Sequence, residues 1–380
     1  MHICYITAEY PVLNLPHGGV GTFVQTLGYK LIKSKFDVSV IRISNVDKVE
    51  VVNDNGVKVY LVPKSRLPFS FIPNSLKINR LIKKINKKHK IDVVETSELG
   101  LAFLRKIKGI KFVIRMHGGH HFFALAEKRN LEWKKVWQEK KSFKKADDIV
   151  AVSKYVAETT KKLLNINDKK VTVIYNPIDL NKFYQSNLEK IEEHSVFFAG
   201  TIVEKKGIRQ LIQSLEYLVD EYPNIKLLIA GRDAFIPGTK EQYRPYLEGF
   251  ITDKIASNIQ FLGMLDNKDI PKYIEKAHVC CYPSHMEAMP IAWLEVLAMG
   301  KTFIASNIGP GYEAVSNKKT GILVNPFKPM EIAEAIRFVF KNKDLSNNFG
   351  KAAREDVLKR FNIEDIVNEN IEFYNLKKIV

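Results

Sequence analysis

The chain alternates between short, nearly continuous apolar runs and longer segments in which apolar residues recur every three or four positions. The first pattern predicts buried β-strands, and the second predicts helices with one apolar face. In the first half, Ile3 to Thr7 and Val38 to Ile43 are predicted strands, and Val20 to Ser34 is the predicted helix between them. This order is typical of a parallel sheet covered by helices.

The same alternation continues to the end of the chain. Further helices are predicted over Leu76 to Lys88 and Ile363 to Lys378. Further strands are predicted at Val57 to Val62, Val93-Val94, Phe112 to Met116, Ile149 to Val152, Val171 to Ile174, Val196 to Ala199, Lys226 to Ala230, Ile259 to Leu262, Val279 to Tyr282, Thr302 to Ala305 and Gly321 to Val324. The sequence therefore predicts two doubly wound α/β domains, with ligand in the cleft between the carboxyl ends of both sheets.

The predicted domain boundary lies near Tyr175 to Phe183, where YNPIDLNKF breaks the periodicity with a proline. This places a first domain at residues 1–177 and a second at 178–362, both of ordinary size.

The stretch from Pro283 to Gly300, PSHMEAMPIAWLEVLAMG, carries the most chemistry. Pro290 suits the first position of a helix, because its missing N–H is not needed there, and Gly300 suits the end. Glu295 is the one ionisable group inside this mostly apolar helix. Because an unpartnered buried carboxylate is costly, we expect Glu295 to have partners.

A second carboxylate, Glu287, precedes the helix and is separated from Glu295 by seven residues. Between them we expect free N–H groups of Met289 and Ile291 at the positive end of the helix dipole. Such a wall suits a ligand with a hydroxyl-bearing group at each end and an anion in the middle. A nucleoside diphosphate sugar has that layout.

A glycine-rich segment, HGGVGTFVQTLG from His17 to Gly28, follows the first predicted strand. A dinucleotide-binding fingerprint is disfavoured, because Gly19 and Gly21 are followed by Val24 and no acidic residue ends the second strand. The glycines would instead give the backbone close approach to an anion or a sugar.

His117 directly follows a predicted strand, at the end of the sheet where open α/β folds bind ligands. A purely structural role is the alternative. His120 and His121 raise the question of a metal, but GGHH lacks regular ligand spacing and we expect no carboxylate partner nearby, so we expect no metal site. The chain also contains no D-x-D triplet, so cations and helix N-termini would have to neutralise a leaving diphosphate.

The Glu287-(seven residues)-Glu295 pattern, with its PS and LAMG flanks, resembles the E-x7-E signature of retaining glycosyltransferases of family 4. The resemblance covers nearly the whole chain and implies the GT-B architecture, two Rossmann-like domains facing a deep cleft. It also implies retaining transfer without a metal and a last segment, residues 363–380, that returns to the first domain. GTIVEKKG at 200–207 matches the G-R-x-x-x-x-K-G element of the family, with Thr201 where arginine is usual.

The resemblance implies that His117 contacts the donor sugar and that no dedicated general base is required, because the leaving oxygen itself takes the acceptor proton. From the residues themselves we expect Lys206 and the amides of Met289 and Ile291 to hold the diphosphate, with Lys205 or Arg232 as a further cation where Thr201 replaces the usual arginine. The predicted catalytic residues are His117, Lys206 and Glu287, and the predicted donor-binding residues are Gly19, Gly21, Thr201, Lys206, Arg232, Met289, Pro290, Ile291 and Glu295.

The net charge of +17 is concentrated in the first half, where residues 1–150 carry 28 Lys and Arg against 13 Asp and Glu. A predicted cationic helix contributes Lys77, Arg80, Lys83, Lys84, Lys87 and Lys88, and a second basic stretch follows Trp133. Either this is an ordinary solvated surface, or it attaches to anionic lipid so that a lipid-linked acceptor reaches the site. No motif that reads nucleic acid accompanies the charge.

No run of eighteen apolar residues and no signal-peptide pattern is present, so we expect a cytoplasmic protein. Peripheral attachment to the inner face of the cell membrane is compatible with this location. The predicted function is transfer of a hexosyl residue from a UDP- or GDP-sugar, without cofactor or metal, to a glycan or lipid-linked acceptor in surface polysaccharide or glycolipid synthesis. A catalytically weak sugar- or partner-binding protein and a sugar-nucleotide epimerase of the same fold remain alternatives.

Overall fold

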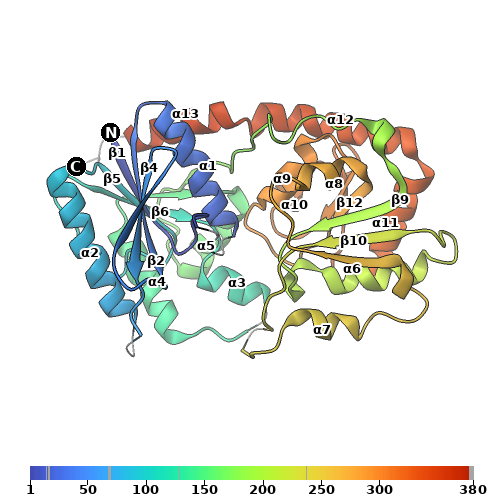
Figure 1. Cartoon of the computed structure of the whole chain (residues 1–380), viewed down its shortest axis with the longest axis horizontal. Coiled ribbons are helices and arrows are strands. Elements are labelled where there is room, and N and C mark those ends of the chain that lie inside the picture. The colour runs from blue at the N-terminus through green and yellow to red at the C-terminus, as the bar shows by residue number, and fades with distance from the viewer. Residues whose placement is uncertain (14, 16–17, 67–69, 128, 237, 376–380) are drawn as a thin grey trace. The chain divides into compact units, whose positions relative to one another are not determined.

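A computed structural model describes residues 1–375 except residues 14, 16–17, 67–69, 128 and 237. The chain divides into two compact units, one formed by Met1–Pro177 with Glu364–Val380 and the other by Ile178–Ile363. Each unit has its own parallel sheet with helices around it (Figure 1). The central strands are mostly apolar runs of the sequence, and strands such as β6 (Lys111–Met116) and β12 (Ala277–Tyr282) are buried at every residue.

The sheet of the N-terminal unit has eight strands in the order β3-β4-β2-β1-β5-β6-β7-β8, and only β3 is antiparallel to its neighbour. Its other strands are β1 (His2–Ile6), β2 (Asp37–Ser44), β3 (Glu50–Asp54), β4 (Val57–Pro63), β5 (Val93–Thr96), β7 (Asp148–Ala151) and β8 (Thr172–Val173). The direction of winding reverses between β1 and β5. A doubly wound sheet binds its ligands at this switch point, beside the carboxyl ends of the strands.

Helices cover this sheet, and in Figure 1 α1 and α13 lie on one side of its strands while α3 and α5 lie on the other. The helices are α1 (Gly19–Lys33), α2 (Phe71–Lys88), α3 (His120–Ala126), α4 (Trp133–Lys145), α5 (Lys154–Leu164) and α13 (Ile363–Asn375). The helix predicted from Leu76 begins five residues earlier, at Phe71, and Lys378 at the end of the last predicted helix lies outside the described residues.

The last helix, α13, is tied to the N-terminal unit by a buried polar network. The guanidinium of Arg115 donates to Glu95 at 2.7 and 3.1 Å, to the side-chain oxygen of Asn370 at 2.6 Å and to the hydroxyl of Tyr374 at 3.2 Å. The Tyr374 hydroxyl in turn donates to Glu95 at 2.8 Å. Because Asn370 and Tyr374 lie on α13 while Glu95 and Arg115 lie on β5 and β6, the network fixes the helix against the sheet.

The sheet of the C-terminal unit has six parallel strands in the order β11-β10-β9-β12-β13-β14. They are β9 (Glu192–Ala199), β10 (Lys226–Ala230), β11 (Ile259–Gly263), β12, β13 (Phe303–Ser306) and β14 (Ile322–Val324). The α-helices are α6 (Ile208–Ser214), α7 (Tyr243–Glu248), α8 (Ile270–Lys276), α9 (Ile291–Ala298), α10 (Gly311–Ala314), α11 (Pro329–Lys341) and α12 (Lys343–Arg360), and the 3-10 turns are Leu188–Lys190, Glu204–Lys206, Leu215–Tyr217 and Ala256–Asn258. Here the winding reverses between β9 and β12.

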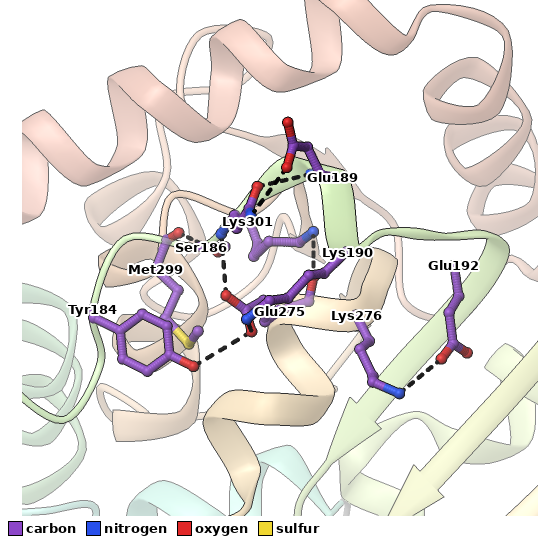
Figure 2. Close-up of polar contacts among 10 residues, drawn as sticks. Tyr184, Ser186, Glu189, Lys190, Glu192, Glu275, Lys276, Met299 and Lys301 are labelled. Atoms are coloured by element: carbon purple, nitrogen blue, oxygen red, sulfur yellow. Dashed lines mark hydrogen bonds and ion pairs between the residues drawn. The ribbon is translucent and has the colours of Figure 1, made fainter.

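A buried carboxylate, Glu275 at the end of α8, joins three segments of the C-terminal unit (Figure 2). It accepts from the Nζ atom of Lys190 at 2.9 Å and from the amide of Asn187 at 3.1 Å, while its own carbonyl oxygen accepts from the buried Nζ atom of Lys301 at 3.1 Å. Beside it, the amide of Ser186 donates to the carbonyl of Met299, which ends α9. These bonds hold the carboxyl end of α9 in place.

Candidate active site

In the C-terminal unit, two loops meet at the carboxyl ends of the neighbouring strands β9 and β12. The first is the turn Glu204–Lys206, and the second is the loop that follows β12. Gly207 between the first turn and α6 has φ +71°, and a Cβ atom there would overlap the carbonyl oxygen of Pro283. The loops are therefore in direct backbone contact at the switch point of this sheet.

Lys206 and Glu287, two of the predicted catalytic residues, are brought together by these loops. The Nζ atom of Lys206 forms an ion pair with Oε1 of Glu287. The two side chains are 20% and 11% exposed. The pair is therefore shielded from most of the bulk water, yet both side chains keep some exposed surface.

A second layer of polar contacts supports the Lys206 turn. Glu204 accepts from Arg209 at 2.7 Å and from the hydroxyl of Tyr243. Burial alone would raise the pKa of Glu204, but these donors outweigh it and hold the pKa at about 2. The amide of His285 donates to the carbonyl of Lys205 at 2.8 Å, which ties the two loops together again. Sequence reasoning missed Glu204 and His285, because nothing in their spacing marks them as a pair of supports.

The helix α9 begins at Ile291, so its first amide belongs to those that a helix leaves without an intrahelical acceptor. Pro290 is the residue before the helix, with extended φ and ψ of −74° and 127°, and is not its first residue as predicted. Gly300 ends the segment with φ +67°, as predicted. Met289 is 3% exposed and makes a contact of its own, so its amide is not counted as free.

Glu295 lies inside α9 and is only partly exposed. The predicted partners are missing: among the described residues its carboxylate accepts no hydrogen bond and forms no ion pair. Burial raises the pKa of Glu295 to about 7, and the nearby charge of Lys182 offsets the rise in part. A carboxylate left with unused acceptor capacity near neutral pH suits a ligand that brings hydroxyl donors.

Thr201 and Arg232 follow the neighbouring strands β9 and β10. The amide of Ile202 donates to the carbonyl of Arg232 at 2.9 Å, so the two loops are joined by their backbones. The guanidinium of Arg232 is exposed and pairs with no other side chain in the part of the chain that the structure describes. Arg232 therefore keeps a cation available beside the position where Thr201 lacks one.

In the N-terminal unit, Gly19 and Gly21 belong to the first turn of α1, while His17 lies outside the described residues. A Cβ atom at Gly21 would overlap the carbonyl oxygen of Glu9, whereas one at Gly19 would meet nothing within 4 Å. Gly21 thus lets α1 approach the protein's own backbone, which differs from the ligand approach expected for it. Gly19 retains open space.

His117 directly follows β6 and is partly exposed. Its ring packs edge-on against Phe23 of α1, with 5.3 Å between centroids. Burial lowers the pKa of His117 to about 3, and the charge of Arg115 adds to the effect. The imidazole is therefore neutral at physiological pH, with one nitrogen that donates and one that accepts.

Two buried carboxylates, Glu98 and Glu139, contact the segment His117–His121. The expectation of no carboxylate near these histidines was wrong, because both arrive from other elements of the fold. Across the described ranges, no group of three His, Cys, Asp or Glu side chains has an arrangement that would hold a metal ion.

Comparison with known families gives the class of the protein. The family model described as glycosyl transferases group 1 matches residues 181–356, and the model described as glycosyltransferase family 4 matches residues 17–182. Together the two models extend over most of the chain. The protein is a family 4 glycosyltransferase.

Relatives and solved structures agree with this class. An uncharacterized glycosyltransferase of Methanocaldococcus jannaschii is 25% identical over 402 residues, covering 99% of this chain and 98% of its own. Glycogen synthase of Mycobacterium tuberculosis is 24% identical, covering 61% of this chain and 54% of its own. Sucrose-phosphate synthase from Thermosynechococcus elongatus superposes with a TM-score of 0.86 at 20% identity, over 98% of both chains. HepE of Anabaena, in complex with UDP and glucose, gives 0.77 at 16% identity over 99% of both chains. The fold of this glycosyltransferase is therefore GT-B.

The predicted cationic helix of the glycosyltransferase is α2. Arg80, Lys83, Lys84, Lys87 and Lys88 are exposed, but Lys77 donates to the carbonyl of Pro63 at 2.8 Å and is partly buried. The apolar face of the helix is formed by Ile78, Ile82 and Ile85, whereas Leu76 is 43% exposed. None of the helices in the described ranges is both long and apolar enough to cross a membrane.

Proposed function

We propose that this glycosyltransferase moves a hexosyl residue from a UDP- or GDP-sugar to a glycan or lipid-linked acceptor, with retention of configuration and without a metal ion. The observation that carries the proposal is the Lys206–Glu287 pair beside the amino end of α9, at the switch point of the C-terminal sheet. HepE of Anabaena has been crystallised with UDP-glucose, which supports a donor of this class.

The C-terminal unit supplies the groups for the nucleotide part of the donor. Lys206 and the first amide of α9 at Ile291 face the diphosphate, where they neutralise the negative charge that grows as it leaves. Glu287 accepts from hydroxyls of the sugar, and Glu295 accepts from hydroxyls of the ribose. The absence of a D-x-D triplet from the sequence supports neutralisation by these groups in place of a divalent ion.

The transfer needs no separate base. As the bond between the sugar carbon and the diphosphate oxygen breaks, the acceptor hydroxyl approaches the same face and forms the new bond. Its proton passes to the departing diphosphate oxygen, so atoms and charge balance without a protein base. Catalysis then rests on positioning and on stabilisation of charge.

The N-terminal unit contributes His117, which we assign to a hydroxyl on the far side of the sugar. Because the ring is neutral near pH 7, it can donate to or accept from a hydroxyl without adding charge. Its edge contact with Phe23 restricts how the ring can turn.

A donor panel tests the proposed reaction. The protein is incubated with UDP- and GDP-sugars, with and without EDTA, and release of the nucleoside diphosphate is measured. We expect slow release from one donor, unchanged by EDTA, and at least a tenfold loss in Lys206→Ala, equivalent to about 1.4 kcal/mol. Loss of activity with EDTA would overturn the metal-free reaction. Binding without release would indicate a sugar-binding protein, and an epimerised product would indicate an epimerase.

A lipid-linked acceptor would require work at a membrane surface, and α2 and α4 offer one. Ile72 and Leu76 of α2 are 46% and 43% exposed, and Trp133 and Trp137 of α4 are 74% and 52% exposed. Phe103 connects the two helices, because its ring lies 4.9 Å from that of Phe71 and 5.7 Å from that of Trp137. We call these exposed apolar residues, together with the five exposed basic residues of α2, the basic-aromatic surface.

This surface combines the two features that hold proteins at anionic bilayers. Tryptophan prefers the interface between headgroups and acyl chains, and each basic residue near the surface adds about 1 kcal/mol of attraction. We expect sedimentation with vesicles that contain phosphatidylserine but not with neutral vesicles, and loss of binding in Trp133→Ala/Trp137→Ala and in Lys83→Glu/Lys84→Glu. If equal amounts of protein sediment with both kinds of vesicle, the basic-aromatic surface is an ordinary solvated surface and not a membrane-binding one.

A further inference from the structure

Two buried carboxylates hold the peptide backbone that follows β6. The amide of His117 donates to Oε1 of Glu98 at 2.7 Å. The amides of His120 and His121 donate to the two carboxylate oxygens of Glu139 at 3.1 and 3.2 Å, and the Nδ1 atom of His121 also contacts Glu139. Three amides within five residues are therefore held by two side chains, which are 2% and 0% exposed.

These carboxylates come from different elements of the same unit. Glu98 follows β5, the strand beside β6, and Glu139 lies on the buried face of α4. Gly119 lies between them: a Cβ atom there would overlap Oε1 of Glu139 and would lie 3.0 Å from Cγ of Glu98. Any other residue at this position would push at least one carboxylate away from the backbone.

Two buried carboxylates cost more free energy than a simple helix cap at the start of α3 would require. A serine or aspartate at the amino end of α3 would satisfy its amides at less cost, because burying a carboxylate requires strong compensation. The cost shows in Glu98, where burial raises the pKa to about 8 and the neighbouring Glu139 adds to the rise. An unfavourable local free energy of this kind is typical of segments whose geometry matters to function.

We propose that Glu98 and Glu139 are positioning residues for His117, fixing the backbone on both sides of Gly119 so that the imidazole is presented at the carboxyl end of β6. The role rests on the proposed function only in that His117 contacts the donor sugar. Glu98 anchors the amide of His117 itself. Glu139 anchors the next turn, which prevents the segment from rotating about Gly118 and Gly119.

The two carboxylates predict different responses to the same substitution. Oε1 of Glu98 accepts from the amide of His117, and the carboxyl group is largely protonated at pH 7. Because a protonated carboxyl and a glutamine amide each have one acceptor oxygen and one donor group, Glu98→Gln retains a suitable acceptor. Both oxygens of Glu139 are in use, so Glu139→Gln places an NH2 group against an amide donor. Glu98→Ala removes the acceptor altogether.

The test is a cycle of variants on kcat/KM for the donor. We expect Glu139→Gln and Glu98→Ala to lower it at least tenfold and Glu98→Gln to stay within about threefold of the wild type. In the His117→Ala background, Glu139→Gln should not lower kcat/KM any further, because Glu139 acts through His117. Independent, multiplicative losses in the double variant, or full activity of His117→Ala, would overturn the proposal.

A readout without turnover separates this proposal from the assigned reaction. In protein labelled with 15N-histidine, we expect the His117 ring to stay neutral between pH 5 and 8, and in Glu139→Gln to titrate closer to its ordinary pKa of 6.5. Glu275→Gln, a buried carboxylate of the other unit, is the matched control and should leave the His117 signal unchanged. A wild type inactive on every donor would refute the reaction alone, whereas an unchanged His117 signal in Glu139→Gln would refute the positioning role.

Discussion

Replacement of Glu287 by Gln should separate binding of the nucleotide from transfer of the sugar. In the structure Lys206 is paired with Glu287, so in the proposed reaction a donor diphosphate has to compete with this carboxylate for the lysine. Gln keeps the shape of the side chain and removes its charge. Lys206 is then released, while the acceptor for the sugar hydroxyls is weakened.

The size of both effects follows from the burial of the pair. Two unit charges about 4 Å apart interact by about 4 kcal/mol at an effective dielectric constant of about 20. Because Lys206 and Glu287 are 20% and 11% exposed and each would regain some hydration on separation, we take roughly a quarter of this after screening by solvent. We therefore expect about fivefold tighter binding of UDP or GDP to Glu287→Gln. Loss of a charge-assisted hydrogen bond, worth about 1.5–3 kcal/mol, should lower kcat at least tenfold.

Calorimetric titration with UDP and GDP gives the affinities, and initial rates at saturating donor give kcat. Lys206→Ala should weaken nucleotide binding and lower kcat together, because the cation itself is lost. The ion pair between Lys190 and Glu275, at 2.9 Å, provides matched controls in the same unit (Figure 2). Lys190→Ala and Glu275→Gln should change stability but not nucleotide affinity. Weaker or unchanged nucleotide binding in Glu287→Gln, with full turnover, would refute the competition.

Three further outcomes follow from buried polar groups. The affinity for an intact nucleotide sugar should rise between pH 6 and 8, because Glu295, with its pKa of about 7, ionises and becomes a stronger acceptor for ribose hydroxyls. Titration calorimetry should show no dependence of affinity on pH in Glu295→Gln. The same lack of pH dependence in the wild type would argue against the contact. Because folding raises the pKa of Glu98 from 4.5 to about 8, its contribution to stability is complete below pH 4.5 and is lost as the pH rises to about 8. The melting temperature of Glu98→Gln should therefore depend less on pH over this interval, and an unchanged dependence would contradict the assignment. Tyr374→Phe removes the hydroxyl that donates to Glu95 at 2.8 Å and should destabilise the protein by about 1–2 kcal/mol, seen in urea unfolding against the exposed control Tyr246→Phe; equal midpoints would mean that the contact does not hold α13.

The periodicity of the sequence predicted the succession of strands and helices along the chain well, because central parallel strands are buried on both faces and appear in the sequence as nearly continuous apolar runs. The missed strand was β3, an edge strand whose Val51 is 61% exposed, so it carries no such run. The turn that follows β3 does carry a sequence signal for a hairpin. Asn55 and Gly56, with φ of 49° and 94°, form the tight turn of a hairpin, and Asn-Gly is the dipeptide that such turns favour.

The candidate site was predictable where a single strand end or loop carries the chemistry, as for His117, Lys206 and Glu287. The supports were not, because each comes from another element. Glu139 lies in WKKVWQEKKSFKK, which reads as a solvated basic helix, yet its side chain is fully buried against the His117 segment. Burial of one charged residue within a charged run is set by tertiary packing and leaves no trace in the local pattern.

The two units use a similar carboxylate contact for different purposes. In each, a carboxylate from the loop of one parallel strand reaches a group in the loop of its neighbour: Glu98 after β5 holds the amide of His117, and Glu287 after β12 holds the side chain of Lys206. An amide held by a carboxylate leaves the imidazole of His117 free for a ligand, so that loop is organised in advance. A lysine held by a carboxylate has to exchange partners when a diphosphate arrives. In the proposed reaction, part of the donor's binding energy breaks the Lys206–Glu287 pair, and this frees Glu287 for the sugar hydroxyls when Lys206 engages the diphosphate.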